Sequence, residues 1–168
     1  FDGQTVIGSR EALALKQQPK SIAIIGGGAI GCEFAYYYNA YGTDVTIIEM
    51  LPRLVPTEDE EVSAQLERSL KRQGIKVMTG VSVEKLAQSG GKAHLTTSGG
   101  AVEAEKVLLG IGVLPNSEGL GLDTLGVALE RGFIKVDDRM ATNVPGIYAI
   151  GDVTGKMMLA HVASAQGV

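Results

Sequence analysis

The chain has 168 residues, with 15 lysines and arginines against 19 aspartates and glutamates, so its formal net charge is −4. Glycine is frequent, at 23 residues, and 45% of the residues are hydrophobic. A chain of this size and apolar content can bury a core, which excludes disorder, and no apolar stretch approaches the roughly 20 residues that a membrane helix needs. We therefore expect a soluble, cytoplasmic protein of one compact domain, or of one domain with an appendage.

The charge balance and the scarcity of ligand residues exclude several kinds of site. An acidic chain without basic runs argues against a nucleic acid or a membrane surface as partner. Cys32 is the single cysteine and cannot form an internal disulfide, and His94 and His161 lack metal-ligand spacing, so no metal site is predicted. Because the chain starts at Phe1 and ends without a helix-stopping signal, we expect an internal part of a longer protein.

The first half of the sequence alternates helix and strand signals. In chain order the patterns predict a helix at 9–16 capped by Ser9, a strand at 21–25 buried on both faces, a helix at 31–41 ended by Gly42, a strand at 44–48, a helix opened by a Thr57–Glu60 capping box with the apolar stripe Val62, Leu66 and Leu70, and a strand at 75–78. This βαβαβ order implies a parallel sheet with right-handed crossovers.

Beyond Gly80 the hydrophobic period changes from helical to alternating. We expect a three-stranded meander at 81–86, 93–97 and 101–103, a buried strand at 106–111, short strands at 127–129 and 133–136, a strand at 147–150 and a helix from Ala160. The glycine- and proline-rich stretch 112–121 suggests a domain edge. The expected organisation is a connecting segment at 1–18, a main domain at 19–118 and a return segment at 119–168.

The strongest site signal is Gly26-Gly27-Gly28-Ala29-Ile30-Gly31, a G-x-G-x-x-G motif between a predicted strand and a predicted helix. Its glycines permit a tight turn, close approach of a pyrophosphate and close helix–strand packing, and the helix N-terminus faces the phosphates. Glu49 follows at the end of the next strand, where a carboxylate can accept both hydroxyls of an adenosine ribose. The pattern predicts a dinucleotide site, with NAD preferred because Glu49 disfavours a 2′-phosphate.

Two residues after the motif have simpler explanations. Glu33 lies in the first turn of the predicted helix, where the helix dipole stabilises an acid by a few tenths of a kcal/mol, so a dipole role and a ligand role both stay open. Cys32 is interpreted as a small apolar packing residue rather than as a redox or catalytic group.

Five segments together resemble a known family. They are Gly26 to Glu33 (Gly-Gly-Gly-Ala-Ile-Gly-Cys-Glu), Glu49, Gly112 to Asn116 (Gly-x-x-Pro-Asn), Thr142 to Asp152 (Thr-Asn-Val-Pro-Gly-Ile-Tyr-Ala-Ile-Gly-Asp) and Met158 to His161 (Met-Leu-Ala-His). Their order and spacing resemble the pyridine-nucleotide disulfide oxidoreductase flavoproteins over nearly the whole chain, and the last two favour the dihydrolipoamide dehydrogenase branch. The resemblance implies an α/β fold: a Rossmann-like NAD-binding domain, a parallel sheet with a β-meander crossover, and a C-terminal tail from the FAD domain.

The resemblance also implies roles for individual residues. Backbone from Gly26 to Gly31 holds the NAD pyrophosphate, Glu49 holds the ribose, and Glu33 reaches toward the nicotinamide amide. Val83 and Gly112 mark the segments that line the adenine and nicotinamide sides. Asp152 contacts the FAD ribityl chain. The implied cofactor-binding residues are Gly26, Gly27, Gly28, Ala29, Ile30, Gly31, Cys32, Glu33, Glu49, Val83, Gly112, Asp152, Met158, Leu159, Ala160 and His161, with no catalytic residue among them.

The resemblance implies that the chain is the NAD(H)-binding part of a homodimeric enzyme. This enzyme passes electrons from dihydrolipoamide through a disulfide and FAD to NAD+. The family's redox Cys-x4-Cys pair and its catalytic His and Glu are absent from these 168 residues, so the chain alone is expected to be inactive. Val113 stands where the family commonly has arginine, which leaves that residue's polar contacts near the dinucleotide open.

The sequence leaves two other interpretations open. The longer protein that contains this chain can be a related enzyme, such as a mercuric reductase, a glutathione reductase or an NADH peroxidase relative. The cysteine segment, which this chain lacks, would distinguish these enzymes. The chain can also be a non-catalytic NAD-sensing module. The implied FAD contacts argue against a sensor, which has no use for them.

Overall fold

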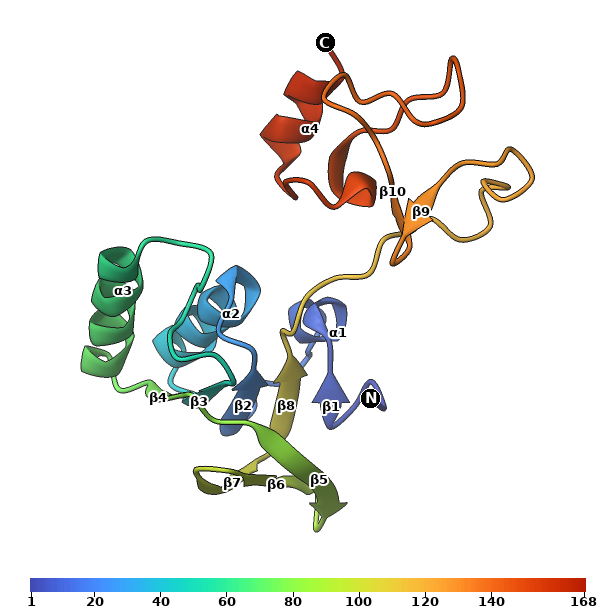
Figure 1. Ribbon diagram of the computed structural model, residues 1–168. Helices are drawn as coiled ribbons and strands as arrows, with labels where there is room; N and C mark the ends of the chain where they lie inside the picture. The colour runs from blue at the N-terminus through green and yellow to red at the C-terminus, as the bar shows by residue number, and fades with distance from the viewer. The chain divides into compact units, whose positions relative to one another are not determined.

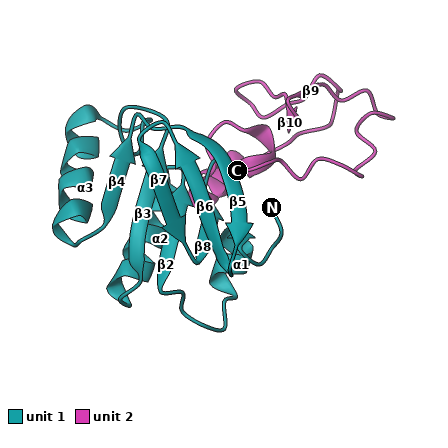
Figure 2. Ribbon diagram, turned by 90° about the horizontal axis from the view of Figure 1, so that it is seen from below, with its two compact units in different colours: residues 1–112 teal, residues 113–168 magenta.

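The computed structural model describes residues 1–168, which form two compact units, residues 1–112 and residues 113–168 (Figure 2). The first unit contains β1 (Val6–Ile7), α1 (Ser9–Leu13), β2 (Ser21–Ile25), α2 (Ala29–Ala40), β3 (Asp44–Glu49), α3 (Glu60–Arg72), β4 (Lys76–Thr79), β5 (Val83–Ser89), β6 (Lys92–Thr97), β7 (Gly100–Ala104) and β8 (Lys106–Leu109). The second contains β9 (Leu129–Glu130), β10 (Phe133–Ile134), a 3-10 helix (Gly151–Thr154) and α4 (Ala160–Gln166). None of the helices has the length and apolar character needed to cross a bilayer.

A five-stranded parallel sheet forms the centre of the first unit, in the order β1-β8-β2-β3-β4. The helices α1, α2 and α3 cover one face, and the antiparallel sheet β5-β6-β7 lies on the other (Figure 1). The predicted α/β fold with a parallel sheet and a meander is therefore confirmed. The sheet also includes β1, which the sequence patterns did not predict because it has only two residues.

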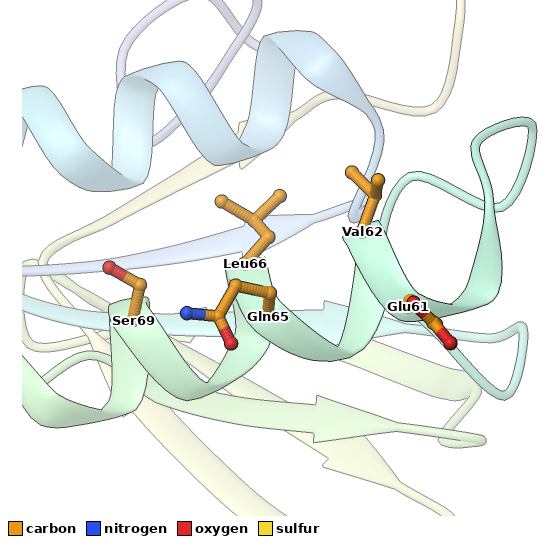
Figure 3. A pocket seen from close by; sticks show the side chains of 5 residues that line it. All are labelled: Glu61, Val62, Gln65, Leu66 and Ser69. Atoms are coloured by element: carbon orange, nitrogen blue, oxygen red, sulfur yellow. The ribbon is translucent and has the colours of Figure 1, made fainter.

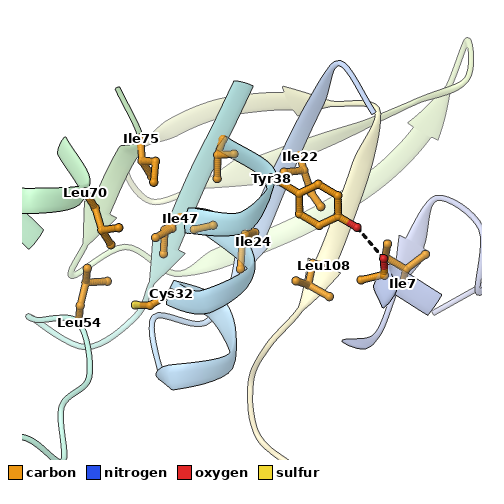
Figure 4. Packing of buried hydrophobic residues seen from close by; sticks show 13 residues of the cluster. Ile7, Ile22, Ile24, Cys32, Tyr38, Ile47, Leu54, Leu70, Ile75 and Leu108 are labelled. Carbon is orange, nitrogen blue, oxygen red and sulfur yellow. Dashed lines mark hydrogen bonds between the residues drawn. The ribbon is translucent and has the colours of Figure 1, made fainter. Parts of the chain in front are cut away.

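The core on the helix side of the sheet is made by every second strand residue. Ile22 and Ile24 of β2 point to this side, together with Ile47 of β3, and all three are almost fully buried. Figure 4 shows them under α2. The hydroxyl of Tyr38 on α2 donates a hydrogen bond of 2.7 Å to the carbonyl of Ala12, which ties α2 to α1. Burying three such side chains stabilises the fold by about 1.5 to 3 kcal/mol each.

The opposite face of the sheet is covered by the meander. Ala23 of β2 and Val107 of β8 pack against Ala93 and Leu95 of β6, and all four are buried. Because both faces of β2 are covered, its residues are apolar in succession rather than alternating, as predicted for a buried parallel strand.

The helix ends differ from the predictions in three places. Helix α1 spans Ser9–Leu13 rather than 9–16, and its N-cap is Gly8, whose N–H donates to the Glu11 carboxylate at 2.9 Å. Helix α2 begins at Ala29, two residues earlier than expected. The cap of α3 is Asp59, which accepts from the N–H of Glu61, so the Thr57 capping box is wrong. Asp59 is a better cap than Thr57 because the positive end of the helix dipole also stabilises its negative charge.

The apolar stripe of α3 is only partly buried. Leu70 is buried and Leu66 is packed against the core, but Val62 is 54% exposed. The helix therefore contacts the sheet mainly through its C-terminal half.

The second unit is built around a small apolar cluster. Its buried members are Val127, Ile134 and Ala149. Strands β9 and β10 pair antiparallel, one or two residues away from the expected positions. The strand predicted at Ile147–Ile150 is wrong: this segment forms only an isolated bridge, from Tyr148 to Ala141. A single bridge arises because no further strand of the described chain lies beside it to continue the ladder.

The two units also differ from the expected division of the chain. Residues before Pro19 join the first unit, because Val6 pairs with Val107 and Ile7 with Leu108. The boundary lies after Gly112 rather than at 118. The stretch expected as a domain edge therefore begins at the boundary and continues into the second unit.

Candidate dinucleotide-binding site

The turn between β2 and α2 is built on close backbone approaches. Gly26 has φ of +111°, and a Cβ at this position would lie 2.4 Å from the carbonyl oxygen of Gly110, which follows β8. A Cβ on Gly31 would lie 2.0 Å from the carbonyl oxygen of Gly26. Since no real Cβ tolerates such distances, packing alone requires glycine at both positions.

The middle glycine of the motif has no such reason inside the protein. Gly28 is extended, with φ of −74° and ψ of −174°, a conformation that any residue adopts. A Cβ on Gly28 would meet no protein atom within 4 Å. The space in front of this glycine is therefore open, at the point where α2 begins.

The N-terminus of α2 is free to bind an anion. No side chain caps it, and no acidic residue lies in its first turn. The first N–H groups of a helix have no partner within the helix and carry the positive end of its dipole. A 12-residue helix of this kind, preceded by an unhindered glycine, offers donors and positive potential to a phosphate.

Glu49 is brought directly to the glycine turn. Its carboxylate is mostly buried, and it accepts hydrogen bonds from the N–H of Gly27 at 2.5 Å and of Leu51 at 2.7 Å. Strand β3 positions it, because β3 pairs with β2 in register up to the residue before Glu49. A carboxylate has about four lone-pair sites, so two bonded N–H groups leave acceptors for further donors.

Glu33 is exposed on the second turn of α2. Because the helix begins at Ala29, Glu33 is its fifth residue and lies outside the first turn in which the dipole acts most strongly. The placement in a first helical turn, from which the dipole explanation was drawn, is therefore wrong.

Cys32 is buried inside the turn rather than exposed to a ligand. Its thiol donates to the carbonyl oxygen of Gly27 at 3.4 Å. Burial raises the pKa of the Cys32 thiol to about 11, and the charges of Glu49 and Glu33 act in the same direction. At neutral pH it is a protonated packing group, as expected from the sequence.

This raised pKa predicts a loss of stability at alkaline pH. The thiolate forms more readily in the unfolded chain, so the stabilisation is complete below about pH 9 and is lost as the pH rises toward 11. Over that window we expect the free energy of unfolding to fall by about 2 to 3 kcal/mol from this group. Urea unfolding between pH 8 and 11 measures it. Cys32→Ala should flatten the decline, and an unchanged slope in that variant would contradict the assignment.

The remaining predicted residues of the first unit lie at its edges. Val83 opens β5 and is packed against the meander side of the core. Gly112 has φ of +123° and is the last residue of the unit. Val113, which stands at the position of the family arginine, is half exposed and belongs to the second unit.

The residues predicted to contact FAD all lie in the second unit. Asp152 is exposed on the 3-10 helix, and Met158 and Leu159 are nearly half exposed before α4. Ala160 and His161 form the first turn of α4, also exposed. The side-chain oxygen of Gln166 on α4 accepts from the N–H of Gly151 at 2.8 Å, which holds the 3-10 helix against α4.

Sequence reasoning missed three residues that shape the turn. Leu54 is fully buried, and its side chain would be 2.6 Å from a Cβ on Gly27. Gly110 donates to the carbonyl of Ile25 at 2.7 Å and closes the turn from β8. Leu51 supplies a donor to Glu49. Only Gly110 carried a signal, as a glycine at the end of a buried strand.

A shallow hollow on the surface lies elsewhere. It follows α3 and is lined by Glu61, Val62, Gln65, Leu66 and Ser69 (Figure 3). All of these residues come from one helix, none was predicted as a site residue, and the hollow does not include the glycine turn. The geometry of the turn is therefore the better guide to a binding site.

Comparisons with known proteins identify the family of the chain. The model of the pyridine nucleotide-disulphide oxidoreductase family matches residues 1–167. Since the match covers nearly all residues, the chain belongs to this family of flavoprotein oxidoreductases.

Within the family the chain is similar to the dihydrolipoyl dehydrogenases. It is 49% identical to the enzyme of Chlorobaculum tepidum over 98% of the chain and 36% of the relative, and 49% identical to that of Mycobacterium leprae over 97% and 36%. Among solved structures, LpdA from Mycobacterium tuberculosis is 33% identical, with a TM-score of 0.90 over 99% of this chain and 37% of that one. The chain thus spans about a third of the length of these relatives.

Proposed function

We propose that the first unit is the NAD(H)-binding part of a dihydrolipoyl dehydrogenase-like flavoprotein. The observation that carries the proposal is Gly28: no contact inside the protein requires glycine at this position, and the space in front of it lies at a helix N-terminus that no side chain caps. A pyrophosphate there would accept hydrogen bonds from the backbone of Gly28 to Gly31.

The same site favours NAD over NADP. Glu49 lies beside Gly27, one residue from the proposed pyrophosphate seat, and its unused lone pairs fit the two ribose hydroxyls. A 2′-phosphate would bring two negative charges toward this carboxylate, which opposes binding. The proposed roles of Glu33, Val83 and Gly112 follow from the family resemblance and come second to this contact.

We further propose that the second unit supplies part of an FAD site. The segment Met158–His161 is exposed and can contact the flavin ring. Asp152 is also exposed, and its carboxylate can accept hydrogen bonds from the ribityl hydroxyls. The side chains present therefore fit this cofactor. FAD, when bound, supplies the hydride that reduces NAD+. In this assignment the first unit, residues 1–112, is the NAD domain, and the second unit, residues 113–168, is a return segment of the FAD domain.

The activity proposed for the whole protein is oxidation of dihydrolipoamide by NAD+, in a cytoplasmic homodimer. The chain itself holds one cysteine, which is buried and protonated, so it has no group that could exchange with a dithiol. Its own residues bind and orient the nicotinamide dinucleotide at the glycine turn.

The purified 168-residue chain should therefore bind NADH but not turn over dihydrolipoamide. Fluorescence titration of NADH should show one saturable site, and addition of FAD should not produce NAD+ reduction by dihydrolipoamide, because a redox disulfide is missing. NADP(H) under the same conditions is the matched control and should bind more weakly. Absence of NADH binding by the folded chain would contradict the proposed function.

A further inference from the structure

The outer face of the meander carries three polar side chains in contact. Along β6 the residues Ala93 and Leu95 point toward the parallel sheet, so the intervening His94 points away from it. His94 is directly opposite Glu103 of β7 and diagonal to Ser89 at the end of β5. Neighbours of this kind on one sheet face lie within side-chain reach.

The three side chains form a chain of contacts. The hydroxyl oxygen of Ser89 lies 2.9 Å from Nε2 of His94, and Nδ1 of His94 lies 3.2 Å from Oε2 of Glu103. The Ser89 hydroxyl donates when Nδ1 carries the imidazole proton, which Glu103 then accepts. A hydroxyl bonded to a base that a third group orients is the arrangement of an activated nucleophile.

Two backbone donors follow Ser89 directly. Gly90 and Gly91 form the turn between β5 and β6, both with positive φ, and the N–H of neither donates to an acceptor of the protein. A Cβ on either glycine would meet nothing within 4 Å, so the space around the turn is open to a small molecule. Free backbone N–H groups are the type of donor that stabilises a developing oxyanion when they point at it.

Glu103 is fixed as a carboxylate by a second partner. Its other oxygen accepts from the ammonium of Lys92 at 2.5 Å. The Lys92 hydrogen bond and charge lower the pKa of Glu103. Glu103 therefore stays ionised and accepts a hydrogen bond from His94 without taking its proton.

We propose that Ser89 is an acyl-accepting nucleophile, with His94 as its general base, Glu103 as the residue that positions His94, and small activated carboxylic esters as the substrate class. Oγ of Ser89 forms a bond to the ester carbonyl carbon while its proton passes to Nε2 of His94. The bond to the leaving oxygen breaks, and that oxygen takes the proton. Water then attacks the acyl-serine by the same route and releases the carboxylic acid.

The exposure of the site limits its power. Ser89 is exposed, and the side chains of His94 and Glu103 are nearly half exposed, so water competes for each contact. General base catalysis contributes about 100- to 10,000-fold in enclosed sites. For the exposed Ser89 we expect a rate enhancement of about tenfold to 100-fold, at or below the lower limit of that range.

The chain contains its own control. Ser98-Gly99-Gly100 repeats the Ser-Gly-Gly sequence in the next hairpin. The hydroxyl oxygen of Ser98 accepts from the N–H of Ser82, and Ser98 forms no hydrogen bond with a histidine. Ser98 therefore reports what an exposed serine before two glycines does without a base.

The test is covalent labelling with a fluorophosphonate, located by peptide mass spectrometry. Phosphorus bonds to Oγ, fluoride leaves, and the proton passes to His94. The native chain should be labelled at Ser89 at least about tenfold faster than at Ser98. His94→Gln should remove that advantage, Glu103→Gln should reduce it, and Glu103→Asp should restore part of it. Ser98→Ala should leave the labelling rate at Ser89 unchanged. Hydrolysis of 4-nitrophenyl acetate should fall in Ser89→Ala.

The labelling position separates this proposal from simple alternatives. Equal labelling of Ser89 and Ser98, or an unchanged rate at Ser89 in His94→Gln, would overturn it. Thermal melting of each variant shows whether the meander is intact, and chain unfolded in guanidinium should lose the preference for Ser89. Ester hydrolysis that persists in Ser89→Ala without an adduct would assign the reaction to histidine alone and also reject the proposal.

Discussion

Replacing Gly28 with alanine should abolish most NADH binding while leaving the fold intact. Its Cβ would project into open space, so no protein contact is broken. Alanine is a poorer N-cap than glycine but restricts the unfolded chain, so we expect the free energy of unfolding to change by less than about 1 kcal/mol. Blocking backbone hydrogen bonds to a charged pyrophosphate should cost about 1.5 to 3 kcal/mol, or roughly 10- to 150-fold in affinity.

Gly31→Ala is the matched comparison, because it changes the same motif for a different reason. Its Cβ would overlap the carbonyl oxygen of Gly26, so the turn itself must shift. Overpacking of this kind costs about 1 to 3 kcal/mol or more. Urea unfolding and NADH titration on both variants should show binding lost without destabilisation in the first and destabilisation in the second. Wild-type NADH affinity in Gly28→Ala would remove the main support for the site.

Glu49→Ala should weaken NAD binding and reduce the preference over NADP. Losing hydrogen bonds from ribose hydroxyls to a charged group predicts a loss of about 10- to 150-fold in NAD affinity, whereas NADP affinity should fall less or rise. The variant also leaves the N–H groups of Gly27 and Leu51 without an acceptor, which should destabilise the fold by about 1 to 3 kcal/mol each if water does not reach them.

Calorimetric titration well below the melting temperature separates the two effects. Glu49→Gln serves as control, because it keeps an acceptor for one N–H while removing the charge. Glu49→Arg should favour NADP further. Unchanged NAD affinity in a folded Glu49→Ala chain would place the ribose elsewhere.

Local sequence patterns predicted the parts of the fold that local physics determines. The strand Ser21–Ile25 was predicted with its observed bounds, because an apolar run between Pro19 and Gly26 has few alternatives. The two-residue β1 was missed since its position depends on pairing with Val107, about a hundred residues later. The strand at Ile147–Ile150 failed for the same reason: apolar, β-branched residues form a ladder only where a neighbour exists.

The candidate site was predictable to a similar extent. The motif and Glu49 were located by spacing, and the structure joins them through the N–H of Gly27. The contribution of Gly110 and Leu54 could not be predicted, because contacts between a turn and a distant strand or loop leave no periodicity. The relation between Ser89, His94 and Glu103 depends on cross-strand register, which a sequence pattern does not fix.

The strand order has a consequence for how the chain is made. β8 is the last strand of the parallel sheet to leave the ribosome, yet it lies between β1 and β2, the first two. Until Lys106–Leu109 emerges, the growing polypeptide has one unpaired β2 edge and a two-residue β1 with nothing to bind. Pairing of β8 joins segments that are far apart in the sequence, which makes folding of the sheet slow. Until then the nascent chain has an unpaired strand edge that can pair with other chains. The intervening meander, whose contacts are local, is able to form before that pairing and shield one face of the waiting strands.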